Sequence, residues 1–536
     1  MNVSDGDAPK PGWAVLLLSG MIVAALCGPL GAGDGPGQVG EWQPPQPWPV
    51  VAIHTAMLPT GKVLHYAYPG GGDGSRGFTW DPASGDFHQV FVSEDLFCSG
   101  HSFLPDGLLY VTGGNDNNCE FQGRFVTHTF DPFSESWTQL EDMSVGRWYP
   151  TNVTLGDGRV LIFSGRNRHC QTTSVVEMYT PGVGIEIIPE AEKFLPLYPR
   201  MHVLTDGKVA YVGPGNGTEL YDPAARQWQF VDWNNFGWRG SGTSVLVPGE
   251  KDQVIIMGGG NDDGVTNTCE VIDFSGPEPQ WQWAAPMNHA RAHANAVILP
   301  DRTVLIVGGG QSGLYGNPVN FAELYDPSSN TWTLLPPQAY GRMYHSTAVL
   351  LPDGRVLSAG QDNGGSGEWG EIYRPAYLYR GPRPVLSAAP STIFYAQTFE
   401  IETPQAEQVA SAALIRLSSV THSFNVEQRY VALALEPVGE STVLATVTSN
   451  ENFAPRGYYM LFIVDADGVP SVAQIVRLDH CLGNLDGDGA VGASDLAALL
   501  GAWGPNPDHP ADLNDDGEVG PEDLAMLLGA WGPCDG

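Results

Sequence analysis

The chain has little positive charge. Its 536 residues include 25 lysines and arginines against 60 aspartates and glutamates, which gives a formal net charge of -35. Because proteins that bind nucleic acids neutralise phosphates with cationic side chains, this balance argues against a nucleic-acid partner. We interpret most of the acidic residues as a solvated surface that keeps a secreted protein soluble.

Long hydrophobic runs are also scarce. One run, from Trp13 to Cys27, follows Lys10 and precedes a stretch of small residues. Such a run is typical of a secretory signal and is short for a bilayer span, with a short membrane anchor as the alternative interpretation. We therefore predict a signal peptide at residues 1–32, no membrane span in the mature chain, and a protein that is secreted or lies at the extracellular surface.

Cysteine is rare, with seven residues in the whole chain. In an oxidising compartment some of them can pair. Cys481 and Cys534 bracket the C-terminal segment, where a disulfide between them would close it. Cys119 and Cys170 follow similar glycine-rich phrases and form a second candidate pair, whereas Cys98 has no evident partner.

Glycine and proline, in contrast, are abundant, with 67 and 43 residues, which favours short strands and turns over long helices. One phrase recurs seven times between residues 48 and 380, as in FLPDGLLYVTGG and LLPDGRVLSAG. Many copies are followed by a second phrase such as ELYDPSSNTWTLL, in which a turn joins two more strands. The pattern predicts a seven-bladed β-propeller over residues 48–380 and resembles kelch repeats.

Two further segments follow the propeller, so the chain as a whole is predicted to be mainly β. Residues 383–479 contain alternating stretches such as ALIRLSS and YVALALEP, which predict an immunoglobulin-like β-sandwich. Residues 481–536 repeat one loop and one apolar helix, with an offset of 28 residues from Asn484 to Asp512. This repeat predicts a small α-helical module with a pair of EF-hand-like loops.

Both repeated loops follow the calcium-binding spacing, with oxygen ligands at positions 1, 3, 5, 7 and 12 and glycine at position 6. The predicted ligands are Asn484, Asp486, Asp488, the Ala490 carbonyl and Asp495 in the first loop, and Asp512, Asn514, Asp516, the Glu518 carbonyl and Asp523 in the second. With aspartate at position 12 in place of the usual EF-hand glutamate, the two loops resemble those of dockerin modules, which bind calcium and dock onto cohesins. The alternative, two metal-free Asp-Gly turns, does not explain two copies at one spacing, each followed by a helix.

Tyrosine, histidine and cysteine occupy matching positions in several blades. Cys98, Tyr149 and His345 each lie eight residues before the aspartate of their turn, and Tyr344 lies nine before. Because equivalent positions of the blades face one axis, we expect these side chains to converge. Imidazole and phenolate are ligands that Cu(II) prefers, and His422, in a polar turn of the sandwich, offers another nitrogen. Neighbouring residues of a regular strand point in opposite directions, so Tyr344 and His345 can share a metal only on a loop or bulge.

Four segments, DLFCSG, GRWYPT, GRMYHS and VTHSFNVEQRY, occur in this order. They resemble the four motifs of the galactose oxidase and glyoxal oxidase family of copper-radical oxidases. The resemblance covers roughly residues 48–480 and includes the order of a kelch propeller and a β-sandwich. It implies an extracellular enzyme that oxidises small aldehydes, as hydrates, or primary alcohols with O2 and releases hydrogen peroxide.

The same resemblance assigns a role to each residue. It implies that a thioether bond joins Cys98 to the ring of Tyr149, and that the cross-linked Tyr149 binds copper and holds a radical. Tyr344 would be the axial ligand and general base. His345 and His422 would be the two imidazole ligands.

The resemblance fails at one position. Galactose oxidase stacks a tryptophan over the cross-linked tyrosine, from a segment just after the next glycine phrase. The corresponding segment here, SGRNRHCQTT, contains no tryptophan. We therefore expect Arg166, Asn167, Arg168 or His169 near Tyr149 instead.

A second interpretation of the chain is a non-catalytic kelch propeller that binds glycans or acts as an adhesin. Taken singly, each candidate site residue is compatible with a buried structural role. Their common register and their order favour the metal site. In either case the C-terminal module is a candidate for binding a cohesin-like or cell-surface partner, with surface attachment or sorting as the alternative.

Overall fold

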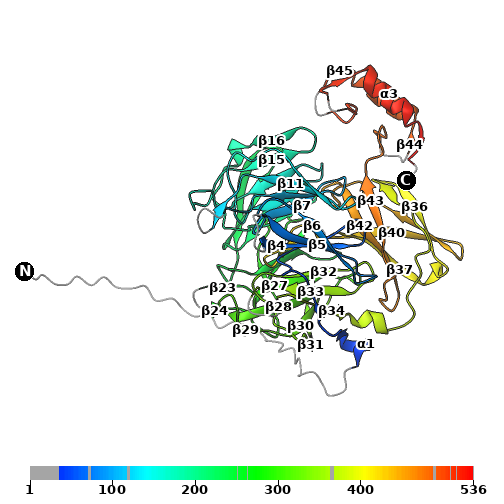
Figure 1. The fold of residues 1–536 in the computed structure, drawn as a ribbon. Helices are drawn as coiled ribbons and strands as arrows, with labels where there is room; N and C mark the ends of the chain where they lie inside the picture. The colour runs from blue at the N-terminus through cyan, green and yellow to red at the C-terminus, as the bar shows by residue number, and fades with distance from the viewer. Residues whose placement is uncertain are drawn as a thin grey trace, which may run out of the picture.

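The computed structural model describes residues 35–69, 74–116, 121–249, 252–261, 264–362, 367–486, 490–506, 509–514 and 516–534. It is mainly β, as predicted, with a propeller, a β-sandwich against its side and a small helical module beyond the sandwich (Figure 1). The predicted signal peptide lies outside the described residues. Over the described ranges, no helix combines the length and the apolar character that a bilayer crossing requires.

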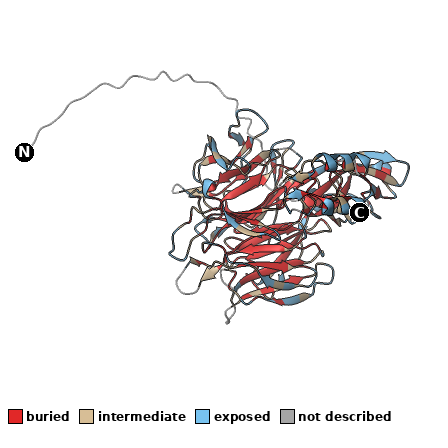
Figure 2. Ribbon diagram, turned by 90° about the horizontal axis from the view of Figure 1, so that it is seen from above, coloured by how far each residue is buried: buried red, intermediate tan, exposed pale blue. Residues whose placement is uncertain are grey.

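The propeller has the seven blades that the repeats predict. From the axis outward they are β3 (His54–Met57), β4 (Val63–Pro69), β5 (Ser75–Trp80) and β6 (Phe87–Phe91); β7 (Gly100–Phe103), β8 (Leu109–Thr112), β11 (Thr127–Asp131) and β12 (Ser136–Gln139); β13 (Thr151–Thr154), β14 (Val160–Phe163), β15 (Glu177–Thr180) and β16 (Gly184–Ile187); β17 (Arg200–Val203), β18 (Val209–Gly213), β19 (Gly217–Asp222) and β20 (Gln227–Trp233); β21 (Thr243–Leu246), β22 (Gln253–Met257), β25 (Cys269–Asp273) and β26 (Gln282–Ala284); β27 (Ala292–Ile298), β28 (Val304–Ser312), β30 (Phe321–Asp326) and β31 (Thr331–Pro337); and β32 (Ser346–Leu350), β33 (Val356–Gly360), β34 (Trp369–Arg374) and β1 (Glu41–Trp42). The inner strands are buried and the outer strands carry most of the exposed residues (Figure 2).

The last blade is closed by the start of the described chain. Strand β1 pairs antiparallel with β34, so that Glu41 faces Arg374 and Trp42 faces Tyr373. Strand β2 (Gln46–Pro47) pairs with the same strand. Both strands precede residue 48, where the sequence places the start of the propeller. This pairing ties the start of the described chain to the last blade of the ring.

The recurring turn phrase has a simple structural basis. Asp106 and Asp157 each accept a hydrogen bond of 3.0 Å from the backbone N–H two residues later. The glycines that follow, Gly107 and Gly158, have φ angles of 90° and 89°. Glycine reaches this left-handed region without steric cost, so the aspartate and glycine together fix the hairpin between the first two strands of a blade.

Buried ion pairs bind the strands of four blades together. In each, an arginine before the inner strand contacts a glutamate on the third strand at 2.5 to 3.0 Å, in the pairs Arg147–Glu177, Arg239–Glu270, Arg291–Glu323 and Arg342–Glu371. Arg291 and Arg342 also donate to the carbonyls of Gly308 and Gly360 at 2.9 Å. A Cβ on Gly308 would lie 2.3 Å from the Arg342 carbonyl oxygen. Gly113, Gly258 and Gly308, which end three of the phrases, therefore make room for the next blade's arginine segment.

The β-sandwich sends a hairpin into the propeller. Its strands follow the order β35 (Thr392–Phe394), β43 (Gln474–Asp479), β42 (Gly457–Asp465), β37 (Val409–Arg416), β40 (Tyr430–Val438), β41 (Thr442–Thr446) and β36 (Thr398–Glu402). Between β37 and β40 the chain forms β38 (Ser419–Thr421) and β39 (Phe424–Asn425). Strand β38 pairs with β3, the innermost strand of the first blade, and so adds the hairpin to the propeller sheet.

The C-terminal module is built from two equal halves. Helices α2 (Ala493–Gly501) and α3 (Pro521–Gly529) are flanked by β44 (Ala490–Val491), which pairs with β47 (Gly532–Pro533), and by β45 (Gly504–Pro505), which pairs with β46 (Glu518–Val519). Leu499 and Leu527 occupy equivalent places in its core. Cys481 and Cys534, the first candidate pair, form a disulfide that closes the module, whereas Cys119 of the second candidate pair lies outside the described residues.

The remaining described elements are short. They are α1 (Pro36–Val39), η1 (Pro189–Ala191), η2 (Ala376–Tyr379), η3 (Ala406–Gln408), β9 (Asn115–Asp116), β10 (Gln122–Gly123), β23 (Gly260–Asn261), β24 (Gly264–Val265) and β29 (Gly316–Pro318).

Candidate metal centre

The structure brings the five predicted site residues together at the propeller axis. Ligand atoms of Cys98, His345 and His422 lie within 4.8 Å of one another, and all three residues are buried. The Tyr149 hydroxyl lies 2.8 Å from His422 Nε2 and is hydrogen-bonded to the Tyr344 hydroxyl. Three blades and the sandwich hairpin thus contribute side chains to one cluster.

A shared backbone conformation turns these side chains toward the cluster. Cys98, Tyr149, His345 and His422 have φ angles of 62°, 66°, 64° and 48°. A residue other than glycine in this region costs on the order of 1–3 kcal/mol and needs support from its surroundings. Strand β32 begins only at Ser346, so Tyr344 and His345 precede the regular strand, as a shared metal requires.

The hydrogen bonds of the two histidines place the ring proton on Nδ1 of each, so each Nε2 keeps a lone pair, which in His422 faces the Tyr149 hydroxyl. Thr421 Oγ1 donates to the Ile53 carbonyl, so it accepts from His422 Nδ1 at 2.6 Å, and His422 Nε2 is unprotonated. His345 Nδ1 contacts the Asp362 carboxylate at 2.5 Å. His345 Nε2 is buried and has no hydrogen-bond partner among the described residues. Two imidazole nitrogens and two phenol oxygens therefore form a donor set that fits copper.

Burial favours the neutral forms of Tyr149, Cys98 and His422. It raises the pKa of Tyr149 well above its ordinary value, and the nearby Cys98 and Tyr344 add to this effect. Burial likewise raises the pKa of the Cys98 thiol and lowers the pKa of His422 well below its ordinary value. A cation bound here would compensate for the loss of a phenol proton, because metal ligands bind in their deprotonated form.

An aromatic ring covers Tyr149 after all, but from an unexpected position. Trp148 stacks on Tyr149 with ring centroids 3.6 Å apart and planes 8° apart. Of the segment expected there, Arg166 exchanges two backbone hydrogen bonds with Trp148 and lies 5.6 Å from its ring. Arg166 of the expected segment thus contacts Trp148, and it is Trp148, which directly precedes the left-handed Tyr149, that supplies the ring stacked on Tyr149.

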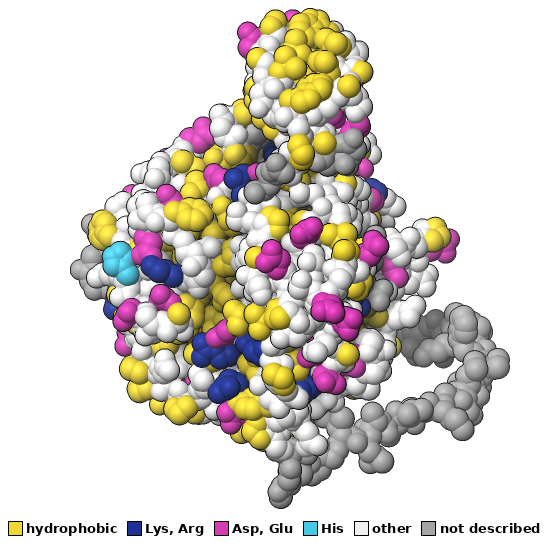
Figure 3. Space-filling view, turned by 90° about the vertical axis from the view of Figure 1, so that its right-hand side faces the viewer, with side chains coloured by type: hydrophobic (Ala, Val, Ile, Leu, Met, Phe, Trp, Pro, Cys, Tyr) yellow, Lys and Arg dark blue, Asp and Glu magenta, His cyan; other side chains and the backbone are white. Residues whose placement is uncertain are grey.

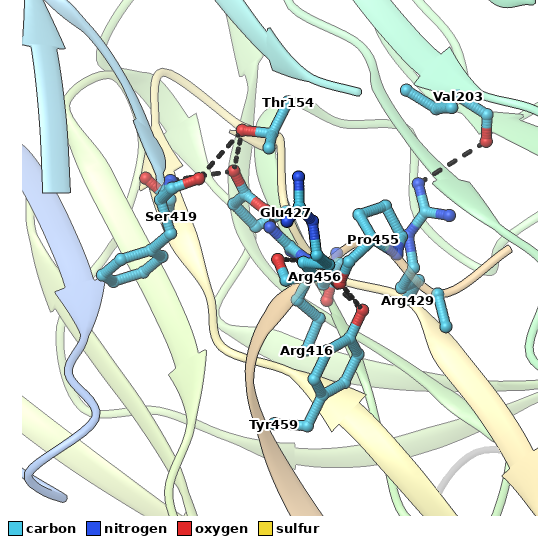
Figure 4. A network of polar contacts seen from close by, with 12 residues as sticks. Thr154, Val203, Arg416, Ser419, Glu427, Arg429, Pro455, Arg456 and Tyr459 are labelled. Carbon is cyan, nitrogen blue, oxygen red and sulfur yellow. Dashed lines mark hydrogen bonds and ion pairs between the residues drawn. The ribbon is translucent and has the colours of Figure 1, made fainter. Parts of the chain in front are cut away.

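The hairpin that carries His422 is fixed to the propeller by a buried carboxylate. Glu427 Oε1 accepts hydrogen bonds from the Phe103 N–H at 3.0 Å and from Thr154 Oγ1 at 3.1 Å, while Oε2 pairs with Arg416 of the sandwich (Figure 4). Sequence reasoning missed this role. The sequence feature that could have indicated it is the presence of charged residues in VTHSFNVEQRY, a segment between two apolar strands.

The fold and the cluster together define a β-propeller protein with a buried group of side chains that could hold a metal ion. The family model "Glyoxal oxidase N-terminus" matches residues 75–369, and "Galactose oxidase-like, Early set domain" matches residues 383–478. The chain therefore belongs to the glyoxal oxidase and galactose oxidase family of copper-radical oxidases, and the predicted oxidase class is confirmed.

Individual relatives agree with this assignment. An aldehyde oxidase of Vitis pseudoreticulata is 31% identical over 440 residues, which cover 72% of this chain and 82% of the relative. A galactose oxidase of Gibberella zeae is 29% identical over 498 residues, which cover 82% and 71%. A solved structure of a fungal alcohol oxidase in complex with copper superposes with a TM-score of 0.73 and 25% identity, over 82% of this chain and 99% of the other.

Proposed function

We propose that this chain is an extracellular oxidase that converts small aldehydes, as hydrates, or primary alcohols with O2 into the oxidised product and hydrogen peroxide. The observation that carries the proposal is the convergence of two imidazole nitrogens and two phenol oxygens in one buried cluster. The printed names of the relatives, which include aldehyde, galactose and alcohol oxidases, support the same substrate classes.

Each residue of the cluster has a part in this proposal. Tyr149, Tyr344, His345 and His422 would hold copper, which when bound accepts one of the two electrons that the substrate releases. Tyr149, joined to Cys98 by a thioether, would accept a carbon-bound hydrogen atom, which carries the other electron. Tyr344 would take the proton of the substrate hydroxyl. Holding the substrate carbon close to Tyr149 would raise the reaction rate further.

Copper loading in air is expected to produce both the cross-link and activity. A peptide that joins Cys98 to Tyr149 should survive thiol reduction and weigh two hydrogens less than its parts. Peroxide should appear with at least one of glyoxal, methylglyoxal, glycolaldehyde, galactose or benzyl alcohol. Cys98→Ala serves as the control that cannot form the cross-link. Copper-loaded protein that shows neither the joined peptide nor peroxide would refute the proposal.

We propose further that the C-terminal module binds two calcium ions. Supporting this, the two loops fold alike around one carboxylate each. Asp495 accepts hydrogen bonds from the backbone of Leu485, Asp486 and Gly492, and Asp523 accepts the equivalent bonds in the second loop. Asp488, another predicted ligand, lies outside the described residues.

The module also carries a surface suited to a partner. Leu500, Trp503, Leu528 and Trp531 are each about half exposed, and the second pair repeats the first after 28 residues. Hydrophobic side chains gather on the outer end of the module (Figure 3). Exposed apolar groups of this kind mark sites of protein association. We propose a cohesin-like or cell-surface protein as the partner.

Replacing Asp523 with asparagine should remove one of the two calcium ions. The change takes away a negative ligand at position 12 of the second loop, which should weaken that site by about tenfold or more. Glu522→Gln is the matched control, because Glu522 is the exposed neighbour on the same helix. Calorimetric titration should count two ions for the parent chain and for the control, and one for Asp523→Asn. Equal calcium binding by all three proteins would contradict the assignment.

A further inference from the structure

A chain of buried hydrogen bonds links Cys98 to the hairpin that carries His422. The Cys98 N–H donates to His54 Nε2 at 3.0 Å, and His54 Nδ1 lies 3.1 Å from His101 Nε2. His101 Nδ1 lies 2.5 Å from the hydroxyl oxygen of Ser419, which is three residues before His422. His54, His101 and Ser419 belong to none of the predicted site residues, and the proposed reaction gives them no role.

The direction of every bond in this chain is fixed. Ser419 donates its single hydroxyl proton to the His101 carbonyl at 3.1 Å, so it must accept from His101 Nδ1. His101 Nε2 is then an acceptor for the proton on His54 Nδ1, which leaves His54 Nε2 as the acceptor for Cys98. Both rings must be neutral for this order to hold. Burial lowers the pKa of His101 to about 3 and the pKa of His54 well below its ordinary value.

The Cys98 peptide is held from both sides. Its N–H is bound by His54, and its carbonyl accepts a bond of 2.9 Å from the Tyr149 N–H. His54 itself is buried and stacks on Tyr66, with ring centroids 4.4 Å apart. These contacts support the left-handed backbone of Cys98, which places its thiol 3.9 Å from the same His422 nitrogen that the Tyr149 hydroxyl contacts.

We propose that His54 is a positioning residue that aims the Cys98 thiol at the Tyr149 ring for thioether formation. The inference rests on the proposed function, because it concerns how that function's cross-link arises. In the step, the S–H bond of Cys98 and one ring C–H bond of Tyr149 break, and a C–S bond forms. The two hydrogen atoms released, with their electrons, reduce one O2 to hydrogen peroxide.

Two substitutions at His54 separate this role from simple packing. The side-chain amide of His54→Gln can reach the place of Nε2 and accept from Cys98, whereas that of His54→Asn is one bond too short. Protein purified without copper is mixed with copper in air, and the joined Cys98–Tyr149 peptide is quantified over time after thiol reduction. His54→Asn should form it about tenfold more slowly than the parent chain, because a buried N–H loses its acceptor. His54→Gln should stay within about threefold, since its acceptor is restored.

His65→Asn is the matched control, since His65 is a buried histidine of the same blade that hydrogen-bonds Thr55 and makes no contact with Cys98. It should form the peptide at the parent rate, and copper content should be equal in all four proteins. Equal rates for His54→Asn and His54→Gln, or a similar slowing in His65→Asn, would overturn the role of His54. Absence of the joined peptide in the parent chain would overturn it too, and absence of both the peptide and peroxide would refute the proposed function.

Discussion

Tyr149→Phe is expected to reduce peroxide production by about a thousandfold or more, because the substitution removes the oxygen at the centre of the cluster. That oxygen contacts both His422 Nε2 and the Tyr344 hydroxyl. The phenylalanine ring keeps the stacking with Trp148, so the fold should survive. Peroxide release from copper-loaded protein measures the activity, and thermal unfolding checks the fold.

Tyr198→Phe is the matched control for this experiment. Tyr198 is buried and stacks on Tyr149 with centroids 4.4 Å apart, but its hydroxyl is not a proposed metal donor and donates to the Ser99 carbonyl. Its loss should cost about 1 kcal/mol of stability, as for a typical buried hydrogen bond, and should change activity only a few-fold. Full activity in Tyr149→Phe, or equal losses in both variants, would contradict the assignment of Tyr149 as ligand and redox residue.

The fold was predictable because its determinants are local and repeated. Asp106 with Gly107, and Asp157 with Gly158, each specify one hairpin through contacts within a few residues, and seven such hairpins imply a closed ring. The closure by β1 was not predictable from the same pattern. That strand has two residues, and its identity depends on pairing with β34, more than three hundred positions away.

In the candidate site, too, the features that follow from the repeats were predictable and the others were not. Cys98, Tyr149 and His345 were placed together because the blades repeat in register, which makes equal spacing mean equal position. His54 and Trp148 were missed because their roles depend on side-chain directions set by left-handed backbone angles. No spacing in the sequence encodes that a histidine of the first blade meets the N–H of a cysteine in the second.

The second large predicted effect concerns Glu427, which attaches the His422 hairpin to the propeller. Glu427→Gln should lower the free energy of unfolding by about 3–5 kcal/mol, because Arg416 keeps its charge in a buried place without a counter-charge. The side chains of this pair are 2% and 3% exposed, so water cannot replace the lost partner. Copper affinity should fall too. Glu427 lies five residues after His422 and binds the Phe103 N–H and Thr154 at the propeller axis, so it holds the His422 hairpin in place.

Two further variants make this prediction specific. Asp157→Asn disrupts an ion pair with Arg159 whose side chains are 44% and 40% exposed, and it should cost no more than about 1 kcal/mol. Replacing both partners, with Arg416→Met and Glu427→Leu, removes the unpaired charge and should recover most of the stability lost in Glu427→Gln. Copper affinity should not recover in the double variant, because leucine offers no acceptor to the Phe103 N–H and Thr154. If calorimetry and copper titration find Glu427→Gln equal to the parent chain, the carboxylate does not join the two domains. If the double variant regains copper affinity with stability, Glu427 acts only through Arg416.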